Sequence, residues 1–434
     1  MKKVHVFWFR RDLRLEDNRG LWEALRGDYP VLPVFIFDPN ILDELPGADA
    51  RVQFIWERLG KLKKILEDQH QSTLQVIHAH PKAAFEQLFG AWDIQGVYTN
   101  EDYEPYARER DQEMGKWLAE KDIPFYCFKD QVIFAKDEVV KDDGDPYVVY
   151  TPYMRKWKAR FREKTPQMHY ASETLLGNLA NAVPAPTPAL EDMGFQPTDI
   201  RVPDFNLGKT LVRDYEDTRN FPARDGTSHL GPHLRFGTVS VRQAVGEALK
   251  PENETFWEEL IWREFFMQIL WHFPRTVHEA FKKPYDNIRW RNNTEEFEAW
   301  KAGKTGYLLV DAGMRQLNQT GYMHNRVRML VASFLCKHLL IDWRWGEAYF
   351  AEKLLDYEMA SNVGNWQWAA GSGVDAAPYF RIFNPMTQVD KFDKGHRYIE
   401  QWVPEAGTDR YPEKIVDHKA ARERCLETYK AALD

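Results

Sequence analysis

The sequence predicts an N-terminal α/β doubly wound domain with a parallel sheet, followed by an all-α C-terminal domain. Two patterns lead to this prediction. In the N-terminal third, short runs rich in β-branched and aromatic residues alternate with amphipathic helical stretches, whereas the C-terminal half shows long helical periodicities. With 434 residues, the chain is also too long for one ordinary core.

The N-terminal part, residues 1–130, contains a series of candidate strands. They are Val4–Phe9, Val31–Phe37, Leu74–Ile77, Val97–Tyr98 and Phe125–Phe128. Because helical stretches separate them, parallel pairing through β–α–β crossovers is the favoured arrangement.

Residues 131–210 are expected to connect the two domains, because the stretch from Thr165 to Asp204 is irregular and rich in proline. Helical periodicity then dominates residues 211–434, which we assign to the second domain. The candidate helices are Phe256–Phe273, Leu308–Gln319, His324–His338 and Tyr349–Asn362.

Composition restricts the kinds of partner. The net charge is −8, so any contact with DNA has to come from a local basic patch. No apolar run of about eighteen residues occurs, and the N-terminus is typical of a strand, so we expect a soluble, intracellular, cytoplasmic protein with no membrane partner. Cys127, Cys336 and Cys425 form no CxxC pair, so neither a disulfide framework nor a cysteine metal site is expected.

A segment rich in small and hydroxyl residues, 226–233 (GTSHLGPH), enters a predicted helix. Such a segment can present backbone N–H and hydroxyl groups to a phosphate. Taken alone, it is better interpreted as an ordinary helix start, in which Thr227 or Ser228 is the N-cap residue.

Two residue pairs lie on single helix faces. Glu259 and Trp262 are three residues apart and place a carboxylate beside an indole, while Asn325 and Met329 are four apart and place an amide beside a thioether. An unstacked pyrimidine pair needs a stacking wall and hydrogen-bonding groups of this kind. Either pair alone would be typical of a helix surface or a core contact.

Five motifs follow one another along the chain: WFRRDLR (8–14), ELIWREFF (259–266), GYMHNRVRM (321–329), NVGNWQWAA (362–370) and DAAPYFRIFNP (375–385). Together they resemble the photolyase/cryptochrome family, and most of all the class I cyclobutane pyrimidine dimer photolyases. The resemblance covers the chain from end to end. It implies the photolyase/cryptochrome fold, with FAD in the helical domain beneath a DNA-facing cavity.

The resemblance also implies roles for individual residues. It places in the lesion pocket Glu259, Asn325, Trp262, Met329 and Trp368. Near the DNA strand it places Arg219, Arg326 and Arg381, each of which would otherwise be interpreted as a surface salt bridge.

The flavin and its electron supply are implied in the same way. On the FAD phosphate side the resemblance places Tyr215, Thr227, Ser228, His229, Leu230 and Gly231. On the ring side it places Arg328, Asp356, Glu358 and Asn362. A chain of electron-carrying tryptophans would be formed by Trp366, Trp343 and Trp290, for which core packing is the alternative; Tyr379 and Phe380 are expected in the core.

Asn362 is the informative residue for function. Plant-type cryptochromes commonly have Asp and animal-type cryptochromes Cys at this position, so Asn favours a repair enzyme with fully reduced flavin. A helix C-cap before Gly364 is the alternative.

The chain departs from the family pattern in places. Tyr106 and Ala107 replace an Asn-Glu pair found in relatives with a folate antenna, which puts a folate antenna in doubt. The second chromophore could be folate, deazaflavin or flavin, or the protein could have none. Phe256 stands where some relatives have Trp. The two-histidine pattern of (6-4) photolyases is absent, since Asn325 and Arg326 follow His324.

The expected function is therefore light-driven repair of cyclobutane pyrimidine dimers, a carbon–carbon lyase reaction in which reduced FAD donates an electron to a flipped-out dimer. Damaged DNA is the expected partner of a monomer that has no obligate protein partner. The alternatives are a signalling cryptochrome, a photolyase of different lesion specificity, and an FAD protein with a structural or redox role.

Overall fold

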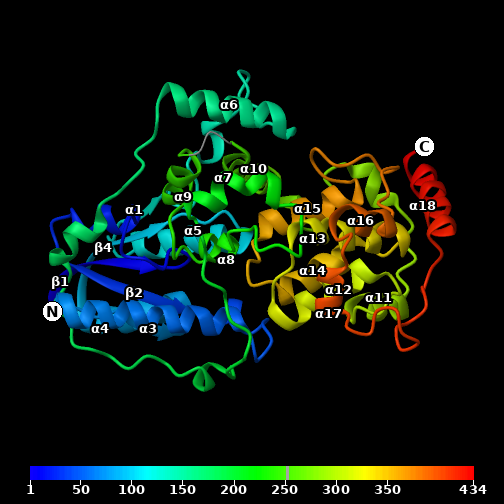
Figure 1. Cartoon of the computed structure of the whole chain (residues 1–434). Coiled ribbons are helices and arrows are strands. Elements are labelled where there is room, and N and C mark those ends of the chain that lie inside the picture. Colours follow the sequence, from blue (N-terminus) through cyan, green and yellow to red (C-terminus); the bar gives the residue numbers. More distant parts are fainter. Residues whose placement is uncertain (251–253) are drawn as a thin grey trace. The chain divides into compact units, whose positions relative to one another are not determined.

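The computed structural model describes residues 1–250 and 254–434 (Figure 1). The chain forms two compact units. Unit 1 consists of residues 1–135, 159–205 and 229–247, and unit 2 of residues 136–158, 206–228 and 248–434. The expected connecting segment, 131–210, is divided between both units, and its role as a linker stays a prediction. None of the described helices is long and apolar enough to cross a membrane.

Unit 1 contains a five-stranded sheet in the order β3-β2-β1-β4-β5, with every pairing parallel. The strands are β1 (Lys2–Phe9), β2 (Val31–Phe37), β3 (Gln75–His78), β4 (Trp92–Asn100) and β5 (Phe125–Phe128). The doubly wound parallel sheet that the sequence predicts is confirmed. β4 is longer than its predicted core of Val97–Tyr98, because pairing with β1 outweighs the low strand propensity of the polar residues before it.

Side chains of β1 alternate between two apolar clusters, so both faces of the sheet are covered. Phe7 and Phe9 pack with residues of α1 (Arg19–Leu25) and α3 (Ala50–His70). Val6 and Trp8 pack with residues of α4 (Pro81–Ala91) and α5 (Pro105–Ala119). The remaining helices of this unit are α2 (Pro39–Leu42), α8 (Leu230–Arg235) and α9 (Val241–Ala248), while α6 (Tyr150–Glu163) is divided between the units.

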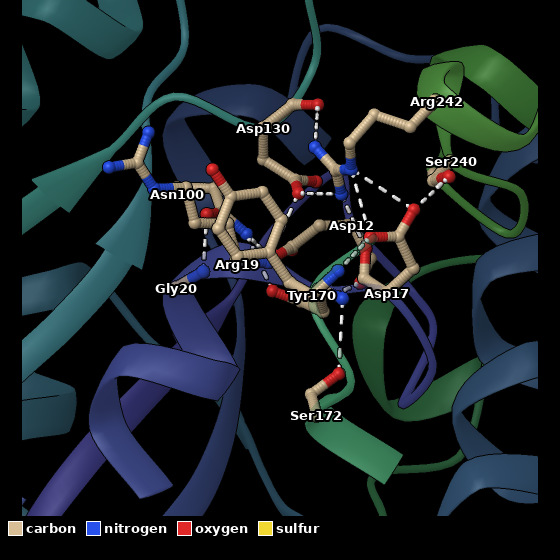
Figure 2. Close-up of polar contacts among 12 residues, drawn as sticks. Asp12, Asp17, Arg19, Gly20, Asn100, Asp130, Tyr170, Ser172, Ser240 and Arg242 are labelled. Atoms are coloured by element: carbon tan, nitrogen blue, oxygen red, sulfur yellow. Dashed lines mark hydrogen bonds and ion pairs between the residues drawn. The ribbon is translucent and has the colours of Figure 1, made fainter. Parts of the chain in front are cut away.

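A buried ionic network lies beyond the carboxyl ends of β1 and β5 (Figure 2). The guanidinium of Arg242, 4% exposed, donates to both carboxylate oxygens of Asp17 at 2.8 and 3.0 Å and to Asp130 at 2.8 Å. Burial works against the charge of Asp130, but Arg14 and Arg242 lower the pKa of this carboxyl to about 2. Asp17 and Asp130 therefore each have a cationic partner.

Asn100, at the end of β4, joins the same network. Its amide donates to Asp12 at 2.6 Å and to Asn18 at 2.8 Å, and its oxygen accepts from the backbone N–H of Gly20 at 2.9 Å (Figure 2). In open parallel sheets, ligands commonly bind at this edge, where the strand order reverses. Here the chain's own ionic side chains lie there and join β1, β4 and β5.

Removal of Arg242 tests this network. The Arg242→Met variant leaves two buried carboxylates without that partner and should reduce the free energy of unfolding by about 3–5 kcal/mol in urea titrations. Arg213→Met is the matched control, because Arg213 pairs with Asp214 at the exposed surface; it should leave stability unchanged. Equal stability of the two variants would contradict a structural role for the network.

Unit 2 is helical, as predicted: its described residues include no strand of the sheet. Its helices are α7 (Lys209–Thr218), α10 (Thr255–His272), α11 (Thr294–Lys301), α12 (Leu308–Thr320), α13 (Asn325–Ser333), α14 (Trp343–Lys353), α15 (Met359–Ala370), α16 (Pro385–Phe392), α17 (Arg397–Trp402) and α18 (His418–Leu433), and a π-helical turn (Phe334–His338) follows α13 directly.

One predicted helix and one predicted core residue of this unit are wrong. The helix predicted over 349–362 is interrupted, since α14 ends before Leu354 and α15 begins after Glu358. Buried Leu354 and Leu355 continue the apolar periodicity, but the backbone N–H of Leu355 bonds to Gly321 of another segment. Phe380 is 61% exposed and therefore not a core residue.

The packing of α15 against α10 depends on Gly364. A Cβ atom at this position would lie 2.2 Å from Cδ1 of Phe266, so any side chain here would push the helices apart. α15 continues to Ala370 and ends with Gly371 in the left-handed conformation, at φ 93°. Asn362 is thus a residue of the helix interior, and its alternative interpretation as a C-cap is wrong.

Candidate functional site

One cavity of unit 2 is lined by residues of α13, α14, α15 and the connection that interrupts the predicted 349–362 helix. It brings together eight residues singled out in the sequence: Asn325, Arg328, Met329, Asp356, Glu358, Asn362, Trp366 and Trp368. The interruption matters here, because it places Asp356 and Glu358 in the cavity wall instead of on a continuous helix.

Arg328 and Asp356 form a two-point ion pair in this wall. Nη1 and Nη2 of Arg328 donate to the two carboxylate oxygens at 3.1 and 2.9 Å, and Nε donates to the carbonyl of Met323 at 2.6 Å. Burial works against the charge of Arg328, but Asp356 raises the pKa of the guanidinium. The pair is therefore a fixed dipole beside the cavity.

Asn362 presents an amide oxygen to the cavity. Its Nδ2 donates to the carbonyl and to Oε1 of Glu347 at 3.1 and 2.9 Å, an orientation assigned from these hydrogen bonds. Burial raises the pKa of Glu347. Glu358 is the N-cap of α15 and accepts from the backbone N–H and the hydroxyl of Ser361, both at 3.1 Å.

Glu259 and Trp262 lie together on α10. A carboxylate oxygen of Glu259 accepts a hydrogen bond from Arg219, so two predicted site residues contact each other directly. Tyr150 stacks on the Trp262 indole at a centroid distance of 3.6 Å and an angle of 9°. One indole face is therefore covered by a residue that the sequence analysis did not single out.

The three arginines predicted near DNA interact electrostatically. Burial lowers the pKa of Arg326, and the charges of Arg219 and Arg381 lower it further. Arg326 also donates to the side chain of Asn220. In the described part of the chain, neither Arg326 nor Arg381 has a carboxylate within ion-pair distance. Of the three arginines, only Arg219 therefore forms the salt bridge that was the alternative interpretation.

The residues predicted on the phosphate side are divided between the units. In unit 2, Tyr215 packs edge-on against Phe256 at 5.1 Å, and the Thr227 hydroxyl lies 3.1 Å from that of Tyr322. Ser228 also belongs to unit 2, and its carbonyl accepts from Asn206 at 2.9 Å.

His229, Leu230 and Gly231 belong to unit 1. His229, with φ 51°, precedes α8 as its N-cap residue, so the interpretation of Thr227 or Ser228 as the N-cap is wrong.

Of the three predicted electron-carrying tryptophans, Trp343 and Trp366 belong to one buried apolar cluster, and the partly buried Trp290 packs against it. Trp366 packs against Phe350 and Trp300 at 4.9 and 6.2 Å, and Trp290 packs against Tyr429 at 6.0 Å. Trp343 is buried at the start of α14.

The indole of Trp366 lies against Gly346, one helical turn after Trp343 on α14. A Cβ atom at Gly346 would be 2.1 Å from Cη2 of Trp366. The close approach of α14 and α15 thus requires glycine at this position.

Sequence reasoning missed three contacts of the predicted site residues: Tyr150 on Trp262, Glu347 on Asn362, and Asn220 on Arg326. Tyr150 is far from α10 in the sequence, so no local spacing could have indicated it. Asn220 directly follows Arg219, and that proximity is the one signal available in the sequence.

The Gly346 contact yields a test of the cavity wall. Gly346→Ala should displace Trp366 and reduce the free energy of unfolding by about 1–3 kcal/mol. Gly395→Ala is the control, since a Cβ atom there meets nothing within 4 Å. Urea titration of both variants measures the difference, and an undiminished stability of Gly346→Ala would contradict the described packing.

Comparison with known proteins identifies the family. A family model described as DNA photolyase matches residues 5–169, and the model of the FAD binding domain of DNA photolyase matches residues 256–409. A deoxyribodipyrimidine photo-lyase of Halobacterium salinarum is 37% identical, with 99% of both chains covered. The chain belongs to the DNA photolyase family.

Solved structures of photolyases agree with this assignment. A bacterial class III photolyase from Agrobacterium tumefaciens has a TM-score of 0.89 at 34% identity, covering 100% of this chain and 98% of that one. An archaeal photolyase from Sulfolobus tokodaii with two FAD molecules has a TM-score of 0.80 at 34% identity, covering 99% and 100%. A cryptochrome from Synechocystis has a TM-score of 0.86 at 25% identity, covering 98% and 99%.

Proposed function

We propose that this photolyase-family protein is a deoxyribodipyrimidine photo-lyase, which binds FAD and uses blue light to split cyclobutane pyrimidine dimers in damaged DNA. The observation that carries the proposal is the cavity of unit 2. Residues assigned to the lesion and residues assigned to the flavin ring line this one cavity, although they come from separate motifs.

The cavity wall fits a flavin ring. It offers the Arg328–Asp356 dipole, the carboxylate of Glu358 and the oxygen of Asn362, beside the apolar side chains of Phe350 and Trp366. Mixed polar and apolar lining of this kind suits a planar heteroaromatic ring. When bound, reduced FAD supplies the light-excited electron donor. Tyr215, Thr227 and Ser228 are proposed on the phosphate side, together with residues 229–231.

Lesion binding is proposed for Glu259, Asn325, Trp262, Met329 and Trp368. Asn325, Met329 and Trp368 line the cavity, and they supply an amide, a thioether and an indole for bases taken out of the duplex. The Glu259 carboxylate can accept hydrogen bonds from base N–H groups. Arg219 orients this carboxylate, and the exposed part of Trp262 that Tyr150 leaves uncovered provides stacking surface.

DNA binding is proposed for Arg219, Arg326 and Arg381. Burial lowers the pKa of Arg326, and the charges of Arg219 and Arg381 lower it further; approaching phosphates would relieve this repulsion. This local concentration of positive charge explains how a chain with a net charge of −8 binds DNA. Electron supply from the surface is proposed for Trp366, Trp343 and Trp290, which lie in or against one apolar cluster.

The identity of a second chromophore is not determined by the residues around Tyr106. Tyr106 bonds to the carboxylate of Asp38 and accepts from Asn40 at 3.0 Å, and burial together with Asp38 raises its pKa to about 12. Folate, deazaflavin, a second flavin and no second chromophore all stay open. The relative with two FAD molecules keeps a second flavin among the alternatives.

We further propose that the protein is a cytoplasmic monomer with no obligate protein partner.

A signalling cryptochrome is the second candidate, because the Synechocystis cryptochrome shares the fold. Asn362 in the cavity and the photolyase relatives favour repair.

The decisive experiment is blue-light repair by purified, photoreduced protein. We expect light-dependent recovery of a cyclobutane thymine dimer in duplex DNA and no recovery in the dark or of a (6-4) lesion. High-performance liquid chromatography of the digested DNA measures both. Recovery of neither lesion by protein that holds photoreducible FAD would favour the cryptochrome function.

Glu259→Gln tests the lesion pocket. Loss of a charge-assisted hydrogen bond of about 1.5–3 kcal/mol should weaken lesion affinity or repair yield per photon roughly ten- to a hundredfold. Glu258→Gln is the control, because Glu258 is the neighbouring carboxylate but pairs with Lys158 at 2.7 Å. If both variants retained wild-type binding and yield, the assignment of Glu259 would be wrong.

A further inference from the structure

A buried lysine holds the backbone of the loop that contains Arg381. This loop, residues 371–384, joins α15 to α16. Nζ of Lys337 donates to the carbonyl oxygen of Arg381 at 2.9 Å. Lys337 is 1% exposed, whereas Arg381 is at the surface. The contact therefore joins an interior ammonium to an exposed loop.

The π-helical turn determines where this lysine lies. The backbone N–H of Leu339 bonds to the carbonyl of Phe334, five residues earlier, at 3.1 Å. Such wide turns are rare and often occur at functional sites. A buried ammonium is unfavourable unless it is hydrogen-bonded, so the Arg381 carbonyl stabilises Lys337 and is fixed by it. In the described part of the chain, Lys337 has no ion-pair partner.

Two apolar contacts hold the loop on either side of Arg381. The ring of Tyr379 stacks on Tyr429 of α18 at 5.8 Å and 15°, and Ile382 packs against the cluster around Leu340. Between them, the backbone N–H of Arg381 bonds to Pro378 at 2.8 Å. Nearer its start, the loop accepts hydrogen bonds from the backbone N–H groups of Lys282, at the Ser372 carbonyl, and of Tyr150, at the Asp375 carboxylate. Lys337 supplies the attachment at the carbonyl of Arg381 itself.

We propose that Lys337 is a positioning residue for Arg381, holding the loop so that the Arg381 guanidinium faces the DNA backbone. The inference rests on the proposed DNA contact of Arg381. Because Lys337 is buried, it does not touch DNA, and any effect of its replacement on DNA binding has to pass through the loop.

The salt dependence of DNA binding tests the proposal. Each phosphate contact contributes about 0.9 to the slope of log affinity against log salt concentration. Lys337→Met should make this slope shallower by about one contact and weaken binding of dimer-containing duplex several-fold. Arg381→Ala should have the same effect, and the double variant should bind no more weakly than Arg381→Ala alone. In Lys337→Met, the repair yield per photon of the saturated complex should be unchanged.

Lys158→Met is the matched control. Lys158 is also a buried ammonium, 6% exposed, but it pairs with Glu254 and Glu258 and makes no contact with the loop. Its replacement should leave the salt slope as in the wild type. Lys337→Arg retains a donor and should restore part of the slope lost in Lys337→Met.

A pH profile of the wild type gives a second readout. Burial lowers the pKa of Lys337 to about 8, so DNA affinity should fall as pH rises through this value and the ammonium is lost. The facing thiols of Cys336 and Cys425 stay protonated there, because burial raises the pKa of both. His338 stays neutral, since burial lowers its pKa to about 3.

The outcomes separate this inference from the proposed function. Three results would overturn the positioning role without affecting the proposed function. They are a salt slope in Lys337→Met equal to that of the wild type, additive losses of affinity in the double variant, and an Arg381→Ala variant that binds DNA like the wild type. Absence of light-driven repair in the wild type would overturn the proposed function. If Lys337→Met does not fold, the pH profile of the wild type decides. A DNA affinity that does not change between pH 7 and pH 9 would then overturn the proposal.

Discussion

The close approach of α15 to α10 and α14 is the constraint on which the cavity of unit 2 depends. It is made at Gly364, against Phe266, and at Gly346, against Trp366. Tight interior packing leaves no space for a methyl group at either contact. With α15 held from two sides, Asn362 and Trp368 project into the same cavity, and the α14–α15 connection brings Asp356 and Glu358 to its wall.

Electrostatics gives this cavity its polarity. Arg328 and Asp356 neutralise each other, and Asn362 adds an amide without charge. Arg219 and Glu259, which pair with each other, are not among the residues that line the cavity. Of the three arginines predicted near DNA, Arg326 and Arg381 have no carboxylate within ion-pair distance among the described residues, whereas Arg219 pairs with Glu259. An acidic chain can in this way bind a polyanion, because screening limits the reach of distant negative charges to about 8–10 Å.

In unit 1, a buried ionic network holds distant segments together. Residues from the ends of β4 and β5, from the segment after β1 and from residues 170–172 and 240–242 meet in the ionic network of Figure 2. Buried ion pairs add little net stability, but removal of one partner is strongly destabilising. Such a network therefore specifies how these segments meet more than it adds to the total free energy of unfolding.

The sequence by itself determined the parallel sheet, the helical second half, and the helix faces shared by Glu259 with Trp262 and by Asn325 with Met329. These features follow from periodicity and spacing, which are local properties of the chain. Motif resemblance assigned Asn325, Met329 and Trp368 to the lesion and Arg328, Asp356, Glu358 and Asn362 to the flavin ring, and all seven line one cavity.

Only the tertiary structure decided the break between α14 and α15, the stacking of Tyr150 on Trp262, and the contact of Lys337 with Arg381. Each joins segments that are distant in the sequence or overrides a local preference. Leu354 and Leu355 continued the apolar pattern of a helix, yet a backbone bond to Gly321 ended it. Long-range hydrogen bonds and packing leave no periodic signal in the sequence, and for that reason they had to be observed.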